Sequence, residues 1–247
     1  MKKGVVILGS LILALAASGA AFAQPSAKAV ETILIDNFDV DQEWDWGVQT
    51  SRFITKGYPL IKKFSGIPNS LRPYHKDSDP EAQVLGVKTK FDRKGDNWFE
   101  VYPTQNGSAY EIPFIGTVTQ VDFWVWGANY NYNLELLVRD ADGRVHILKA
   151  GTLAFQGWRN VVINIPGYIN QHSRLRSGRP NMTFVGFRIR TDADEAVDDY
   201  VVYFDQLKYT TNTLSTVYDG YELKDADFGD KENADGSSPS VVSGSDK

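Results

Sequence analysis

The feature that most constrains this chain is the period of two in its apolar residues between positions 33 and 210. Along residues 121–127, for example, Val, Phe and Val alternate with Asp, Trp and Trp, so both faces of this segment carry large side chains. Successive side chains of a β-strand point to opposite faces, so this spacing predicts strands. No heptad pattern and no long amphipathic helix interrupts it. We therefore expect an all-β fold.

Seven or eight strands are expected, separated by turn sequences that contain Gly, Pro, Asn and Asp. The clearest hairpin joins 134–138 to 145–148 through Asp-Ala-Asp-Gly at 140–143. The other expected strands are 33–35, 98–102 (ending at Pro103), 121–127, 158–165, 185–189 and 201–209. Because crossover helices are missing, we exclude a parallel α/β sheet and predict an antiparallel two-sheet β-sandwich of jelly-roll type.

Three regions fall outside this pattern. The first is expected to be a cleaved secretory signal peptide, residues 1–23, with two lysines, an apolar run over 5–17 and Ala-Phe-Ala before the cleavage point. Residues 50–90 contain four prolines and predict a long irregular loop. The segment 225–247, rich in Asp, Gly and Ser, predicts a disordered acidic tail. A single sandwich domain is therefore expected over 24–224.

Composition excludes several classes of site and of partner. The 247 residues include no cysteine, which rules out disulfides, thiol nucleophiles and thiolate metal sites. A net charge of −5 argues against nucleic acid as a partner. The three histidines lack metal-binding spacing, and no glycine motif for a phosphate cofactor is present, so no cofactor is expected. Two acidic clusters, 36–43 and 192–199, show no separable catalytic pair of carboxylates. One alternative is a structural calcium ion held by Asp36 and Asp205, where the first and last strands could meet.

Aromatic residues are the strongest candidates for a functional surface. Two Trp pairs and one Tyr pair have i, i+2 spacing, which puts both rings of a pair on one face of a strand. The pairs are Trp44 with Trp46, Trp124 with Trp126, and Tyr130 with Tyr132. They are interpreted either as a stacking surface for sugar rings or a protein partner, or as part of the core. Sequence leaves both alternatives open.

Several of these segments resemble one family. They are Ile-Asp-Asn-Phe-Asp at 35–39, Gly-Tyr-Pro at 57–59, Val-Asp-Phe-Trp-Val-Trp-Gly at 121–127, Gly-Trp-Arg-Asn at 157–160 and Tyr-Phe-Asp-Gln-Leu-Lys at 203–208. They are similar to segments of the spirochaete flagellar filament outer layer proteins, the FlaA family. The resemblance spans roughly residues 30 to 215. Similar strand motifs also occur in carbohydrate-binding β-sandwich modules.

The resemblance implies a non-enzymatic sheath protein of the periplasmic flagellum, with no catalytic residues and no cofactor. Such a protein coats the flagellin core and contributes to filament stiffness, curvature and motility. Its implied partners are the core filament, other sheath proteins and further copies of itself. We expect it in the periplasm, with no membrane insertion after signal cleavage. The alternative functions are a secreted carbohydrate-binding module, which would use the Trp pairs, and a secreted glycoside hydrolase.

Overall fold

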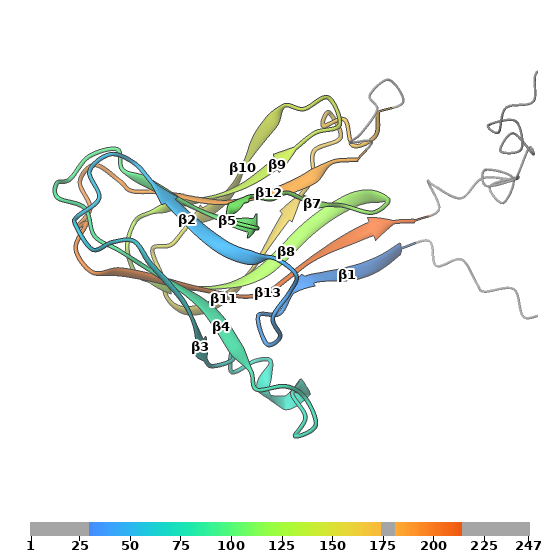
Figure 1. Ribbon diagram of the computed structural model, residues 1–247, viewed down its shortest axis with the longest axis horizontal. Helices are drawn as coiled ribbons and strands as arrows, with labels where there is room; N and C mark the ends of the chain where they lie inside the picture. Colours follow the sequence, from blue (N-terminus) through green and yellow to red (C-terminus); the bar gives the residue numbers. More distant parts are fainter. Residues whose placement is uncertain (1–29, 174–180, 214–247) are drawn as a thin grey trace, which may run out of the picture.

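The computed structural model describes residues 30–173 and 181–213, which form two antiparallel β-sheets packed face to face (Figure 1). Sheet A contains, in spatial order, β11 (Gln156–Asn164), β8 (Thr117–Ala128), β13 (Tyr200–Asn212), β4 (Gln83–Thr89) and β3 (Leu60–Ser65), and β1 (Val30–Asp36) also pairs with β13. Sheet B contains β10 (Val145–Thr152), β9 (Asn133–Arg139), β12 (Thr183–Arg190), β5 (Trp98–Gln105) and β2 (Asp45–Thr50). The short strands β6 (Ser108–Ala109) and β7 (Ile112–Pro113) pair with β5 and β12. The predicted antiparallel sandwich is confirmed.

Phenylalanine rings pack together with Val, Leu and Ile side chains in the core between the sheets. Phe187 of β12 and Phe204 of β13 stack across it, with ring centroids 4.7 Å apart and planes 8° apart. Phe123 of β8 contacts both rings. All three residues are at most 1% exposed. The period of two is therefore explained by one side of each sheet facing this apolar layer.

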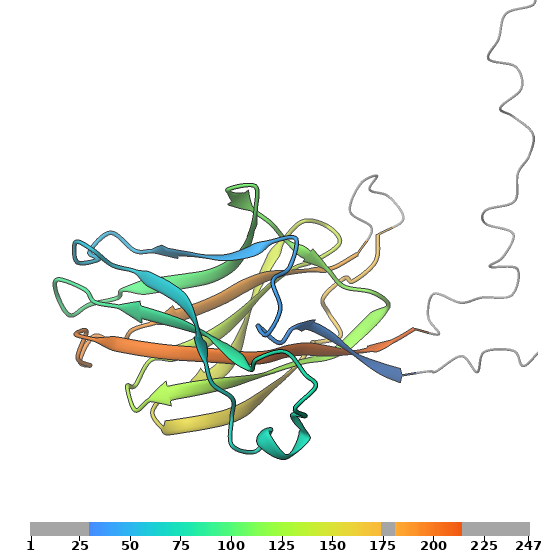
Figure 2. The same cartoon turned by 60° about the horizontal axis from the view of Figure 1, so that its bottom comes forward.

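Strand β13 is central to sheet A because it pairs with three other strands. One edge of β13 pairs with β8. The other edge pairs with β4 through residues 200–204 and with β1 through residues 207–212. Between these two ladders lies a bulge, where Gln206 has a φ of +51°. The turned view in Figure 2 shows β1 beside the C-terminal half of β13. The bulge thus marks the place where β4 and β1 separate.

The segment 50–90 is more regular than the sequence predicts. It contains β3 and β4. Its irregular stretches are 51–59 and 66–82, and the second includes a short 3₁₀ turn, Arg72–Tyr74, in the excursion at the bottom of Figure 1. Its prolines lie outside β3 and β4, so they interrupt no strand. Strand β5 also runs through Pro103, where the sequence predicts its end. The ladder to β12 stops at Val101, so a residue without an N–H is tolerated there.

Two of the expected regions lie outside the described residues: the signal peptide, 1–23, and the acidic tail, 225–247. Among residues 30–173 and 181–213, no helix is long and apolar enough to cross a membrane. The described chain starts and ends at adjacent positions of sheet A, because Val30 of β1 pairs with Asn212 of β13.

Candidate functional site

The outer side of sheet A carries a group of aromatic rings. Trp124 and Trp126 of β8 point away from the core between the sheets, because the alternating Phe123 and Val125 are fully buried in it. In the ladders, Trp126 lies opposite Trp158 of β11 on one side and Tyr203 of β13 on the other. Three neighbouring strands therefore contribute rings to the same side.

Phe64 of β3 extends this group across the sheet. Its ring lies edge-to-face with Tyr203, 5.8 Å between centroids and 85° between planes, and Tyr203 meets Trp126 at 5.5 Å and 75°. Gly86 of β4 lies beneath the first contact. A Cβ atom there would approach Phe64 Cε2 to 2.7 Å and Tyr203 Cε1 to 2.8 Å, so the absence of a side chain allows the rings to meet. We call Phe64, Trp124, Trp126, Trp158 and Tyr203 the aromatic face.

Exposed aliphatic side chains surround the aromatic face. Leu34 of β1, Leu60 of β3 and Val162 of β11 are each about half exposed, at 50%, 53% and 51%. A shallow groove of about 140 Å³ runs between Leu60 and Tyr203, with Lys62 and Lys88 among its lining residues. A sheet surface with this many apolar side chains in water is typical of a surface that binds another molecule.

The outer side of sheet B is different, because it carries a row of charged and amide side chains. Five strands contribute one residue each in register: Lys149, Glu135, Arg188, Glu100 and Gln49. Arg188 Nε donates to Glu100 Oε1 over 2.6 Å, and the Gln49 amide donates to the other oxygen of Glu100. Much of this charge is therefore neutralised within the sheet.

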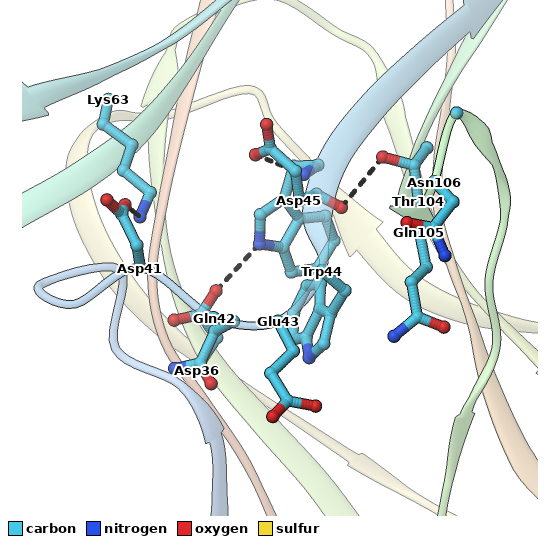
Figure 3. Close-up of a pocket in the computed structure, with 12 residues that line it drawn as sticks. Asp36, Asp41, Gln42, Glu43, Trp44, Asp45, Lys63, Thr104, Gln105 and Asn106 are labelled. Atoms are coloured by element: carbon cyan, nitrogen blue, oxygen red, sulfur yellow. Dashed lines mark hydrogen bonds and ion pairs between the residues drawn. The ribbon is translucent and has the colours of Figure 1, made fainter.

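The pair Trp44 and Trp46 is divided between the core and a pocket. Trp46, in β2, is 5% exposed and packs on Phe38, Phe184 and Phe187. Its indole Nε1 donates to Asp36 Oδ2 over 2.8 Å (Figure 3). Trp44 precedes β2 and is half-buried, edge-to-face on Trp46 at 5.3 Å and 68°. The i, i+2 spacing does not put these rings on one strand face, because β2 begins between them.

The pocket beside Trp44 has a volume of about 570 Å³ and lies at one end of the sandwich. It is lined by the segment from Asp41 to Trp46, by Lys63 of β3, and by the turn from Thr104 to Gly107. The two sides are joined where Thr104 Oγ1 donates to the carbonyl oxygen of Asp45 over 3.2 Å. We call this cavity the Trp44 pocket.

Tyr130 and Tyr132 belong to a buried cluster with Tyr200. Tyr132 and Tyr200 are fully buried, with ring centroids 4.4 Å apart, and Tyr130 contacts both. The Tyr132 hydroxyl donates to the Ala196 carbonyl over 2.6 Å, and burial raises the pKa of Tyr132 well above its ordinary range. Of this pair, Tyr132 therefore belongs to the core, and the half-buried Tyr130 packs against it.

Asp36 and Asp205, the expected calcium ligands, are both 2% exposed and lie near the β13 bulge. Asp36 already accepts hydrogen bonds at both oxygens, from the Phe38 backbone N–H and from Trp46. Asp205 Oδ1 has no hydrogen-bond partner among the described residues. Burial, together with the nearby charges of Asp39 and Asp36, raises the pKa of Asp205 to about 7. Within 30–173 and 181–213, no group of three or more acidic or histidine side chains is placed to hold a metal ion.

A family profile and similar proteins from two spirochaetes all point to one protein family. The profile described as "Flagellar filament outer layer protein" matches residues 16–218. A "putative flagellar filament outer layer-like protein" of Brachyspira hyodysenteriae is 27% identical over 197 residues, covering 77% of this chain and 83% of that protein. The "flagellar filament outer layer protein" of Treponema pallidum is 36% identical over 116 residues, 42% of this chain and 33% of that protein.

Solved structures similar to this fold include carbohydrate-binding modules. The family 11 module of a cellulosomal cellulase of Clostridium thermocellum matches with a TM-score of 0.42 at 12% identity, covering 75% of this chain and 96% of the module. A structure from a study of promiscuous carbohydrate-binding modules of the β-sandwich superfamily matches with a TM-score of 0.43 at 9% identity. It covers 66% of this chain and 56% of that one.

Proposed function

Because the chain belongs to the flagellar filament outer layer protein family, we propose that it is a structural subunit of the layer that coats the periplasmic flagellar filament. The single observation that supports this role best is the aromatic face. A coat subunit must contact its neighbours or the core filament over an extended area, and such contacts use buried aromatic anchors. Sheet A offers these anchors on four strands of a rigid sheet.

The same proposal includes the finer features of the role. The flagellin core, other sheath proteins and further copies of this chain are the partners. The contacts around a helical core are heterologous and need not close into a ring. Export by a cleaved signal peptide would deliver the subunit to the periplasm, where it contributes to the stiffness and curvature of the filament and hence to motility. No catalytic step is assigned to any residue.

Protein contact fits the aromatic face better than the alternative of glycan binding. Sugar rings stack on the flat side of an aromatic ring, and extended glycans need several rings in one plane. Trp126 and Tyr203 are 75° apart, and Tyr203 and Phe64 are 85° apart, so successive rings present edges and faces in turn. Edge-to-face contact is the geometry that aromatic rings prefer when they pack on one another. The rings therefore form an apolar cluster rather than a flat platform for sugar rings.

The experiment is incorporation into filaments in a deletion strain that expresses variants. Trp126→Ala with Trp158→Ala removes two adjoining rings of the aromatic face, and Tyr168→Ala removes an exposed ring, 76% exposed, from elsewhere on the surface. We expect purified periplasmic flagella to contain at least about tenfold less of the double variant than of wild type or Tyr168→Ala. Circular dichroism and urea unfolding of the purified chains control for folding.

Normal incorporation of a folded double variant would show that the aromatic face is not the contact surface. Absence of the wild-type chain from intact filaments would contradict the proposed function itself. The deletion strain is expected to assemble the flagellin core while losing filament curvature or motility.

A further inference from the structure

The Trp44 pocket has a fixed aromatic wall. Trp46 is held by its hydrogen bond to Asp36 and by three core phenylalanines, and Trp44 rests edge-to-face on it. One part of the Trp44 ring is therefore packed against the core, while the rest borders the cavity (Figure 3). A half-buried indole with a rigid support offers an apolar surface at low entropic cost.

The remaining walls supply polar groups that have no partner within the protein. Four lining side chains, Gln42, Glu43, Gln105 and Asn106, make no hydrogen bond or ion pair to other residues of the described chain. Three of them are primary amides, each with two N–H donors and one acceptor oxygen, and the fourth is a carboxylate. The turn that carries Asn106 is fixed by positive φ angles of 53° and 76° at Asn106 and Gly107.

The other acidic groups around the pocket are already engaged. Asp41 Oδ1 forms an ion pair with Lys63 Nζ at 3.0 Å, and Asp45 Oδ1 accepts the Trp46 backbone N–H at 2.7 Å. Asp36 uses both oxygens. Glu43 is therefore the carboxylate without a partner among these acids. A calcium ion requires six to eight oxygen ligands, so the free groups fit a cation poorly.

From these groups we infer that the Trp44 pocket binds a neutral saccharide, with a C–H face of a sugar ring on Trp44 and hydroxyl groups on the amides and Glu43. A sugar presents hydroxyls that both donate and accept, together with an apolar ring face, and this matches one aromatic wall facing mixed donors and acceptors. The cavity of about 570 Å³ lies within the usual range for small-molecule sites. This inference does not depend on the filament role.

The test begins with the purified chain on an array of neutral mono- to hexasaccharides, followed by calorimetric titration of the strongest binder. We expect Trp44→Ala and Gln105→Ala each to weaken binding, the first by at least about tenfold. Glu43→Gln keeps an acceptor oxygen and should retain measurable binding. Trp158→Ala, on the aromatic face, is the matched control and should bind as wild type does.

Three results would overturn the inference. One is no binding to any array glycan at about 10 mM by the folded wild-type chain. Another is a loss of binding in Trp158→Ala with no change in Trp44→Ala, which would place the glycan on sheet A. The third is calcium binding, measured by calorimetry, that Glu43→Gln abolishes, because this would identify a cation site. Gln105→Ala tests the pocket independently if Trp44→Ala fails to fold.

Discussion

Asp205 lies at the β13 bulge with a buried carboxylate whose Oδ1 has no hydrogen-bond partner among the described residues. Burial, with a contribution from the charges of Asp39 and Asp36, raises its pKa from 3.8 to about 7. Asn has the same shape and no charge. We therefore predict that Asp205→Asn makes the protein more stable at neutral and alkaline pH, although it removes a buried group of the native chain.

The magnitude follows from the two pKa values. Below about pH 4, Asp205 is protonated in both the folded and the unfolded chain, so it has almost no effect on the free energy of unfolding. Between about pH 4 and 7 the unfolded chain ionises first, so stability falls as pH rises. Above pH 7 the loss reaches about 4 kcal/mol, since each tenfold step in the proton equilibrium is worth 1.36 kcal/mol. The stability difference between the variant and wild type should therefore increase by up to about 4 kcal/mol from pH 4 to pH 8.

Urea unfolding at pH 4 and pH 8, followed by tryptophan fluorescence, measures this difference. EDTA is included so that no divalent cation neutralises the carboxylates. The exposed Asp77→Asn controls for the loss of one negative charge on the same chain. An unchanged stability difference between the two pH values, or a variant that becomes relatively less stable at pH 8, would refute the assignment of Asp205 as a destabilising buried charge.

Two further substitutions test how the aromatic residues are supported. Gly86→Ala should lower the free energy of unfolding by about 1–3 kcal/mol in urea titration, because its Cβ atom would collide with Phe64 and Tyr203; Gly66→Ala, whose Cβ atom meets nothing closer than 3.7 Å, is the control, and equal costs would contradict the packing argument. Trp46→Phe should cost about 2–4 kcal/mol in the same assay, because a carboxylate oxygen of β1 loses its buried N–H donor and a cavity opens in the core. A loss below about 0.5 kcal/mol would show that this hydrogen bond contributes little.

The sequence predicts which residues alternate along one strand, but it does not predict which strands become neighbours. The pattern along β8 puts Trp124 and Trp126 on one face and Phe123 and Val125 on the other, but only the structure shows which face is buried. Trp158 and Tyr203 join them only through the pairing of β11, β8 and β13. This pairing is non-local, so periodicity carries no signal for it.

The i, i+2 spacing also wrongly predicts that two rings share one strand face when the strand begins between the two residues. Trp44 and Trp46 are separated by the first residue of β2, so one ring enters the core and the other borders a pocket. Tyr130 and Tyr132 have the same spacing, yet both contact Tyr200, far along the chain. In both cases tertiary packing, rather than the pattern, decides which side chain is exposed.

The distribution of the aromatic face over β3, β8, β11 and β13 has a mechanical consequence. A force applied to these rings is shared by four strands of one sheet. Strand β13 transfers it further, through its ladders to β4 and β1. Hydrogen bonds loaded together in shear resist more force than bonds that are peeled apart one at a time. Sheet A would therefore deform as a single plate when the layer to which it belongs is bent.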